Sequence, residues 1–224
     1  MATSIQCVIF DLDNTLYDQM DYVSGLMDHI ARTLSEKYTL DAQETSMQLL
    51  SYWKEKGPFY GRFFDDMVQK LSIDSDEVQK LIDISHSYQP TISTYPAVPV
   101  VLESLKQQYS LAIITDGNVQ VQQQKIAALG IEQYFAKIEY ATGEHMKPSQ
   151  KPYDAVLEHF ALQPSEAIYV GDNPTVDFVT PNSMGMTTVR VLTGYFQDLQ
   201  LDHQHEAAHT IQTLDGLSGV MSSL

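Results

Sequence analysis

Two aspartates near the N-terminus, Asp11 and Asp13, are separated by a single residue and directly follow a mostly apolar run, residues 5–10. Such a run is typical of a strand buried on both faces. Because side chains two positions apart on a strand point the same way, both carboxylates would converge at the carboxyl end of the sheet. Two adjacent anions are costly without a cation or a proton between them, so the pair suggests a divalent-metal site. An Asp-rich turn or a helix cap would place the same residues there for structural reasons alone.

A hydroxyl and a glycine turn follow a later predicted strand, at Thr115, Asp116 and Gly117. This turn can present backbone N–H groups and a hydroxyl to an anion, as phosphate sites do, or it can serve as a helix N-cap. Lys147 lies in a loop before a later helix, where a lysine can reach a phosphate or a carboxylate as a point charge. A solvated surface lysine is the structural alternative.

A second pair of carboxylates, Asp172 and Asp177, follows Gly171 at the end of another predicted strand. These side chains could complete the oxygen-rich shell that Mg²⁺ prefers, or they could form a turn and a helix cap. Each of these polar segments stands where a predicted strand ends or in the loop that follows.

Alternating strands and helices must position these residues. Further apolar runs predict strands at 111–114, 138–140, 167–170 and 187–191, and apolar spacing of three and four predicts helices at 99–109, 119–129 and 153–160. A succession of βαβ units indicates a doubly wound parallel sheet. We therefore predict an α/β core formed by residues 1–16 and 93–224.

Residues 17–92 show helical spacing only and predict an inserted helical domain, which could cover a site or bind a partner. The predicted apolar faces are Tyr22, Leu26, Ile30, Leu34 and Tyr38; Met47, Leu50 and Trp53; Phe63, Met67 and Leu71; and Val78, Leu81 and Ile82. We expect Trp53 in the interior of this domain. The segment 57–62, with its aromatic residues and Arg62, could contact a substrate, but an interhelix turn with its aromatics packed inside is favoured.

The composition excludes several classes of partner. The chain has 224 residues and a formal net charge of -16, which disfavours binding to nucleic acid or to an anionic membrane surface. The single cysteine, Cys7, lies in an apolar run and predicts a buried thiol in a reducing compartment. Without a basic leader or a long apolar span, the sequence predicts a cytoplasmic protein. His203, His205 and His209 are interpreted as surface residues around a last strand at 208–211, and not as a metal site.

The four polar segments, in this order, resemble the motifs of the haloacid dehalogenase-like hydrolase superfamily, in its phosphatase branch. The motifs are Asp11-x-Asp13-x-Thr15, then Thr115, then Lys147, then Gly171-Asp172 with Asp177, and the inserted helices resemble that family's type 1 cap. Lys147 is preferred to Lys151, which repeats a Lys-Pro pair four residues later, because Tyr153 stands at the family's usual spacing from Lys147. The role of His145, near this lysine, stays open.

The resemblance implies a Mg²⁺-dependent phosphatase that hydrolyses a small phosphomonoester, a nucleotide or a sugar phosphate, through an aspartyl-phosphate. Asp11 would be the nucleophile and Asp13 the general acid and base. The metal would be held by Asp11, the backbone carbonyl of Asp13 and Asp172, with Asp177 supporting these ligands. The groups expected to bind phosphate are Leu12, Thr115, Asp116, Gly117 and Lys147. A phosphomutase of the same family and a non-catalytic scaffold are the alternatives, and the choice between monomer and homodimer is left open.

Overall fold

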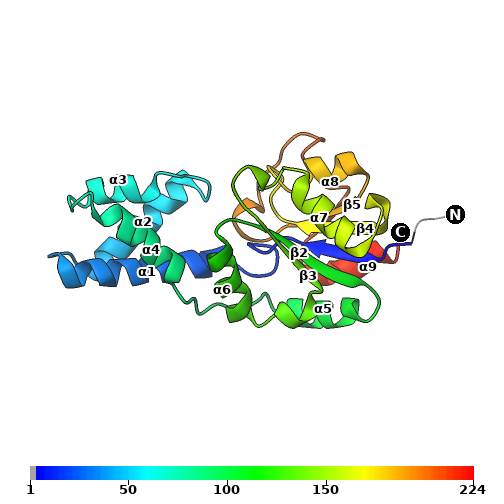
Figure 1. The fold of residues 1–224 in the computed structure, drawn as a ribbon, viewed down its shortest axis with the longest axis horizontal. Helices are drawn as coiled ribbons and strands as arrows, with labels where there is room; N and C mark the ends of the chain where they lie inside the picture. The colour runs from blue at the N-terminus through cyan, green and yellow to red at the C-terminus, as the bar shows by residue number, and fades with distance from the viewer. Residues whose placement is uncertain (1–3) are drawn as a thin grey trace. The chain divides into compact units, whose positions relative to one another are not determined.

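The computed structural model describes residues 4–224, and its core is a six-stranded parallel β-sheet (Figure 1). The strands lie in the order β3-β2-β1-β4-β5-β6, and every neighbouring pair is parallel. Their bounds are β1 Cys7–Phe10, β2 Ser110–Asp116, β3 Lys137–Ala141, β4 Ala167–Gly171, β5 Thr187–Val191 and β6 His209–Ile211. The predicted parallel α/β fold is therefore confirmed.

Strand β1 occupies the centre of the sheet, between β2 and β4. Phe10 lies level with Ile113 of β2 and Val170 of β4, and all four residues of β1, Cys7 included, are fully buried. Burial on both faces explains why the sequence of β1 is a continuous apolar run and not an alternating one. The shared register also means that the residues following β1 and β4 leave the sheet side by side.

Helices pack on both faces of the sheet, with α7 and α8 on one face and α5 on the other (Figure 1). The helices of this part are α5 Val98–Lys106, α6 Val119–Leu129, α7 Lys151–Phe160, α8 Val179–Met184 and α9 Leu217–Met221. Single turns of 3-10 helix occur at Glu132–Tyr134, Gly143–His145, Pro164–Glu166, Gly194–Phe196 and Leu214–Gly216. Between residues 4 and 224 no helix combines the length and the apolarity needed to cross a membrane.

The chain divides into two compact units. One comprises the residues up to Gln19 together with Ile92–Leu224, and the other comprises Met20–Thr91. The helices of the insertion are α1 Gln19–Lys37, α2 Ala42–Lys56, α3 Phe63–Lys70 and α4 Glu77–Ser87. Within the first unit, Tyr17 bridges Asp13 and Thr94, and the Tyr95 N–H donates to the Leu16 carbonyl at 3.0 Å. The chain therefore leaves and re-enters the core at adjacent points, and the insertion does not interrupt the pairing of β1 with β2.

Helix α2 buries a different face from the predicted one. Its buried residues are Thr45, Ser46, Leu49 and Tyr52. Met47 is instead 58% exposed, and Leu50 and Trp53 are only partly buried. The Ser46 hydroxyl donates to the Asp28 carboxylate of α1, so a polar contact lies on the packed face. The buried face of α2 begins with two hydroxyl residues, so a prediction from apolar residues alone selects a neighbouring face of the helix. The predictions that Met47 and Trp53 lie in the interior are therefore wrong.

Candidate active site

Three carboxylates meet at the carboxyl end of the central strands. Asp11 follows β1, and Asp172 follows the neighbouring strand β4. The Asp11 N–H donates to the Val170 carbonyl at 2.8 Å, and this hydrogen bond fixes the two strand ends against each other. Asp177 lies in the turn after Asp172. One carboxylate oxygen from each of the three lies within 4.8 Å of the others, and all three residues are buried. Among residues 4–224 this is the only group of His, Cys, Asp or Glu side chains that could hold a metal ion.

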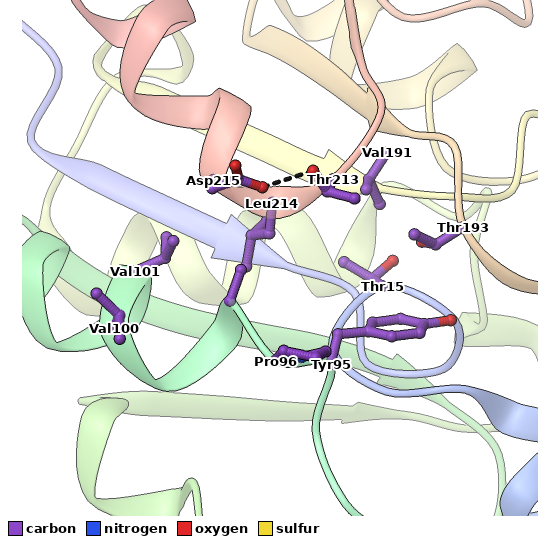
Figure 2. A pocket seen from close by; sticks show the side chains of 11 residues that line it. Thr15, Tyr95, Pro96, Val100, Val101, Val191, Thr193, Thr213, Leu214 and Asp215 are labelled. Atoms are coloured by element: carbon purple, nitrogen blue, oxygen red, sulfur yellow. Dashed lines mark hydrogen bonds between the residues drawn. The ribbon is translucent and has the colours of Figure 1, made fainter.

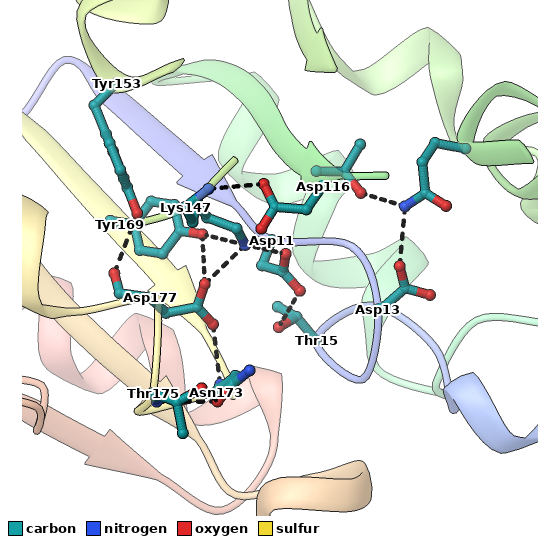
Figure 3. A network of polar contacts seen from close by, with 12 residues as sticks. Asp11, Asp13, Thr15, Asp116, Lys147, Tyr153, Tyr169, Asn173, Thr175 and Asp177 are labelled. Carbon is teal, nitrogen blue, oxygen red and sulfur yellow. Dashed lines mark hydrogen bonds and ion pairs between the residues drawn. The ribbon is translucent and has the colours of Figure 1, made fainter. Parts of the chain in front are cut away.

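Lys147 lies between Asp11 and Asp177 (Figure 3). Its Nζ is 2.5 Å from Asp11 Oδ1 and 2.8 Å from Asp177 Oδ1, and it also contacts the Tyr169 hydroxyl at 3.0 Å. Burial by itself would lower the pKa of Lys147, but the charges of Asp11 and Asp177 outweigh it and hold that pKa well above its usual value. The ammonium therefore stays charged. Lys151 is exposed and contacts His145 at 3.1 Å, so the structure brings Lys147 and not Lys151 to the carboxylates.

The raised pKa values of Asp11 and Asp172 indicate a shortage of positive charge at the cluster. Burial raises the pKa of Asp11 to about 7 even though Lys147 acts to lower it. Burial, and next to it the charge of Asp11, raises the pKa of Asp172 well above its usual range. The Asp172 Oδ2 atom is buried and has no hydrogen-bond partner among the described residues. A buried carboxylate oxygen without a donor fits a hard divalent cation such as Mg²⁺, which binds oxygen ligands.

Asp177 is engaged on both of its oxygens. Oδ1 accepts hydrogen bonds from Lys147 and from the Tyr169 hydroxyl, at 2.8 and 3.0 Å, and Oδ2 accepts the Asn173 N–H at 2.9 Å. It also packs against Gly171, where a Cβ atom would lie 2.5 Å from Asp177 Oδ2. Glycine is therefore required for this close approach. With its lone pairs so occupied, Asp177 is better suited to orienting Lys147 and the loop of Asp172 than to binding a metal directly.

The Asp13 carboxylate is bound by two side chains of helix α6 and not by Lys147. Lys125 Nζ contacts Asp13 Oδ1 at 2.7 Å and Gln122 Nε2 donates to Asp13 Oδ2 at 2.9 Å, while the Tyr17 hydroxyl also donates to Oδ1. Burial would raise the pKa of Asp13, but Lys125 and these hydrogen bonds outweigh it and lower that pKa. Because its side chain is bound here, any contact of Asp13 with a metal in this conformation would have to come from its backbone carbonyl.

The turn that follows Asp13 is held from outside the motif. Asn14 has a left-handed backbone, φ 60°, which asparagine tolerates better than most residues. The Thr193 hydroxyl donates to the Asn14 carbonyl at 2.6 Å, and Gly194 packs so closely on Asn14 that a Cβ atom there would lie 2.3 Å from Oδ1. Thr15 donates from Oγ1 to Asp11 Oδ2 at 3.3 Å. These contacts fix both aspartates of the first motif.

Three of the predicted phosphate-binding residues, Thr115, Asp116 and Gly117, lie at the end of β2. Thr115 is buried, and its Oγ1 accepts a hydrogen bond from Gln122, which leaves the hydroxyl hydrogen free to be donated. Asp116 Oδ1 accepts the Lys147 N–H at 3.0 Å, and the Gly117 N–H donates to the Ala141 carbonyl at 3.0 Å. The amide of Gly117 is thus already bonded within the fold, and in this conformation it does not point to an anion as expected. Leu12 follows Asp11 directly, and its side chain is buried.

Arg190 connects Asp172 to the C-terminal segment. This buried residue of β5 donates from Nε to the Asp172 carbonyl at 3.3 Å, and its Nη1 contacts both oxygens of Glu206, at 3.0 and 2.8 Å. Its Nη2 donates to the carbonyls of Phe196 and Leu199, at 2.8 and 2.7 Å. Arg190 is not among the residues predicted from the sequence, although a charged residue inside an apolar strand run is a signal that could have identified it.

A cavity of about 510 Å³ lies behind Thr15, next to the start of α5 (Figure 2). It is lined by Thr15, Tyr95, Pro96, Ala97, Val100, Val101, Val191, Thr193, Thr213, Leu214 and Asp215. Its lining is mainly apolar and includes none of the predicted catalytic side chains. The chemistry therefore belongs to the carboxylate cluster and not to this cavity.

The remaining candidates lie apart from the cluster. His205 pairs with Asp202 at 2.7 Å in an exposed segment, and His203 is exposed. In the segment 57–62, Phe59 is 65% exposed, so the expectation that its aromatics pack inside is wrong for this residue. Tyr60 is partly buried and donates from its hydroxyl to Asp66 of α3 at 2.5 Å.

Comparisons with known proteins identify the family. A family profile described as haloacid dehalogenase-like hydrolase matches residues 8–191. A glyceraldehyde 3-phosphate phosphatase of Methanocaldococcus jannaschii is 31% identical over 98% of each chain, and a pyrophosphatase PpaX of Bacillus mycoides is 25% identical over 95% of this chain and 99% of its own. The crystal structure of a HAD phosphatase from Thermococcus onnurineus superposes with a TM-score of 0.67 at 23% identity, covering 97% of this chain and 98% of the other. The chain therefore belongs to the haloacid dehalogenase-like hydrolase family.

Proposed function

We propose that this protein is a Mg²⁺-dependent phosphatase that hydrolyses a small phosphomonoester through an aspartyl-phosphate on Asp11. The observation that carries the proposal is the position of Asp11, a buried carboxylate at the end of a central strand that is fixed by Lys147 and Thr15. A nucleophile held rigidly on a strand end is what an in-line attack on phosphorus requires. We further propose that it acts in the cytoplasm, where a lone buried thiol such as Cys7 is usual.

The residues of the site divide between the two steps of this reaction. In the first step an Asp11 oxygen bonds to phosphorus and the bond from phosphorus to the leaving oxygen breaks. The protonated form of Asp13, which Lys125 disfavours in this conformation, gives its proton to that oxygen. In the second step water attacks phosphorus, Asp13 takes the proton of the water, and the Asp11 carboxylate is regenerated with release of phosphate. Thr115 and Lys147 bind the phosphoryl oxygens as their charge develops.

Asp11, Asp172 and the backbone carbonyl of Asp13 are the proposed holders of Mg²⁺, with Asp177 orienting them through Lys147 and the Asn173 N–H. When bound, the ion offsets the negative charge shared by the carboxylates and the phosphate. The unpartnered Asp172 Oδ2 supports this assignment.

The substrate class is proposed to be a small phosphorylated metabolite, with sugar phosphates tested first. The relative at 31% identity is named for glyceraldehyde 3-phosphate, and a second one for pyrophosphate, so these two compounds head the panel. Nucleoside monophosphates complete it. Free phosphate distinguishes hydrolysis from a mutase, which would instead return an isomerised sugar phosphate.

The test is phosphate release by the full chain with Mg²⁺, compared with Asp11→Asn and with wild type after chelation. The exposed residue Asp198 gives a matched control, Asp198→Asn, for which we expect unchanged rates. We expect both Asp11→Asn and chelation to abolish release of phosphate. Activity that survives Asp11→Asn would refute the aspartyl-phosphate mechanism, and activity that survives chelation would refute the metal requirement.

A further inference from the structure

Helix α6 presents two polar side chains on its buried face. Gln122 and Lys125 stand three residues apart, next to the buried Ile126, and the Lys125 side chain is only 5% exposed. Burying a lysine costs free energy unless its charge is compensated. Here the compensating charge is the Asp13 carboxylate, 2.7 Å from Nζ.

Gln122 connects the same carboxylate to a second predicted group. Its Nε2 donates to Asp13 Oδ2 at 2.9 Å and to Thr115 Oγ1 at 2.5 Å. One amide therefore sets the distance between the proposed acid and base and the proposed phosphate-binding hydroxyl. Lys125 fixes the other oxygen of the carboxylate, so that rotation of Asp13 about its side-chain bonds breaks at least one of these contacts.

From this geometry we propose that Lys125, together with Gln122, is the positioning residue for Asp13 in proton transfer. The inference rests on the proposed phosphatase function and adds to it. Lys125 does not contact the transferring phosphoryl group in this role. It keeps the Asp13 carboxylate where a proton can pass to the leaving oxygen in the first step and from water in the second.

The two steps separate when the leaving group needs no proton. With p-nitrophenyl phosphate the departing p-nitrophenolate is a weak base, so the first step needs little help from Asp13, but the second step still requires Asp13 to take the proton of water. Loss of the positioning residue should therefore spare formation of the aspartyl-phosphate and slow its hydrolysis. With an alkyl phosphate such as glycerol phosphate, both steps should slow.

The experiment is stopped-flow mixing of p-nitrophenyl phosphate with wild type and Lys125→Met, together with steady-state turnover of glycerol phosphate. We expect Lys125→Met to keep a burst of about one p-nitrophenolate per protein, at a rate within about threefold of wild type. Steady-state turnover of both substrates should fall on the order of 100-fold, since general acid–base catalysis contributes about 10²–10⁴-fold. Lys125→Arg, which keeps the charge, should recover part of the turnover. Lys106→Met, at an exposed lysine of α5, is the matched control and should behave as wild type.

Two outcomes would overturn the inference: unchanged turnover in Lys125→Met, or a burst and a turnover that fall by the same factor, as a structural defect would cause. If Lys125→Met does not fold, Gln122→Leu makes the same test, because it removes the hydrogen bond to Asp13 Oδ2 and leaves no buried lysine without its partner. Failure of the proposed function itself looks different, since wild type would then release no phosphate in a manner that depends on Asp11.

Discussion

Binding of Mg²⁺ should release protons and strengthen steeply with pH, because the carboxylates that would hold the ion are hard to ionise in the metal-free protein. The pKa of Asp11 is raised to about 7, so its ionised fraction falls from about 0.9 at pH 8 to about 0.1 at pH 6. This alone weakens binding about tenfold. Asp172, whose pKa is also raised well above its usual range, must lose its proton too, which makes the dependence on pH steeper. Affinity should therefore drop by more than about tenfold from pH 8 to pH 6.

Isothermal titration calorimetry with Mg²⁺ measures both quantities. Repeating the titration in two buffers of different ionisation enthalpy gives the number of protons released. We expect this number to exceed about 0.5 near pH 7, which is the share of Asp11 alone. Asp198→Asn should leave this number unchanged, because that residue is exposed and outside the cluster. An affinity that is the same at pH 6 and pH 8, with no proton released, would show that burial does not keep these carboxylates protonated.

Three substitutions test other parts of the structure. Asp172 has a folded-state pKa above its unfolded value, so without metal it destabilises the fold as pH rises above about 4. Chelated Asp172→Asn should consequently melt above chelated wild type at pH 8, by a margin that shrinks toward pH 4, and should lose the rise in melting temperature caused by Mg²⁺. Gly171→Ala places a Cβ 2.5 Å from Asp177 Oδ2 and should cost about 1–3 kcal/mol in urea unfolding and lower kcat as well. Arg190→Met breaks the pair with Glu206 and should cost about 3–5 kcal/mol in the same assay, whereas a loss under 1 kcal/mol would contradict that estimate.

The sequence predicts the positions of those site residues that directly follow a strand. Asp11 and Asp172 could be placed together because parallel strands end at one edge, and β1 and β4 are neighbours in the sheet. Lys147 could be preferred to Lys151 only through the family's spacing, and the structure brings Lys147 to Asp11. The chemical roles of these residues stay predictions until the variants are measured.

The residues that sequence analysis missed are polar residues on packed faces. Gln122 and Lys125 lie on the buried side of α6, and Ser46 lies on that of α2, where a search for apolar periodicity gives them no weight. Each has a hydrogen-bond partner in another part of the fold, such as Asp13 for Lys125, across 112 positions. A contact of this kind depends on the tertiary fold and leaves no local pattern. Buried polar residues at helical spacing are therefore the signal to seek.

The chain carries one tryptophan and one cysteine, and they lie in different units. Cys7 is fully buried in the central strand, and burial raises the pKa of its thiol to about 12, so an alkylating reagent can modify it only when the sheet opens. Trp53 belongs to α2 of the inserted unit, where its fluorescence follows the packing of the helices. The natural sequence thus contains a separate reporter for each unit. Comparing the rate of thiol labelling with the change in fluorescence across a denaturant series would reveal whether the two units unfold in one cooperative step or in succession.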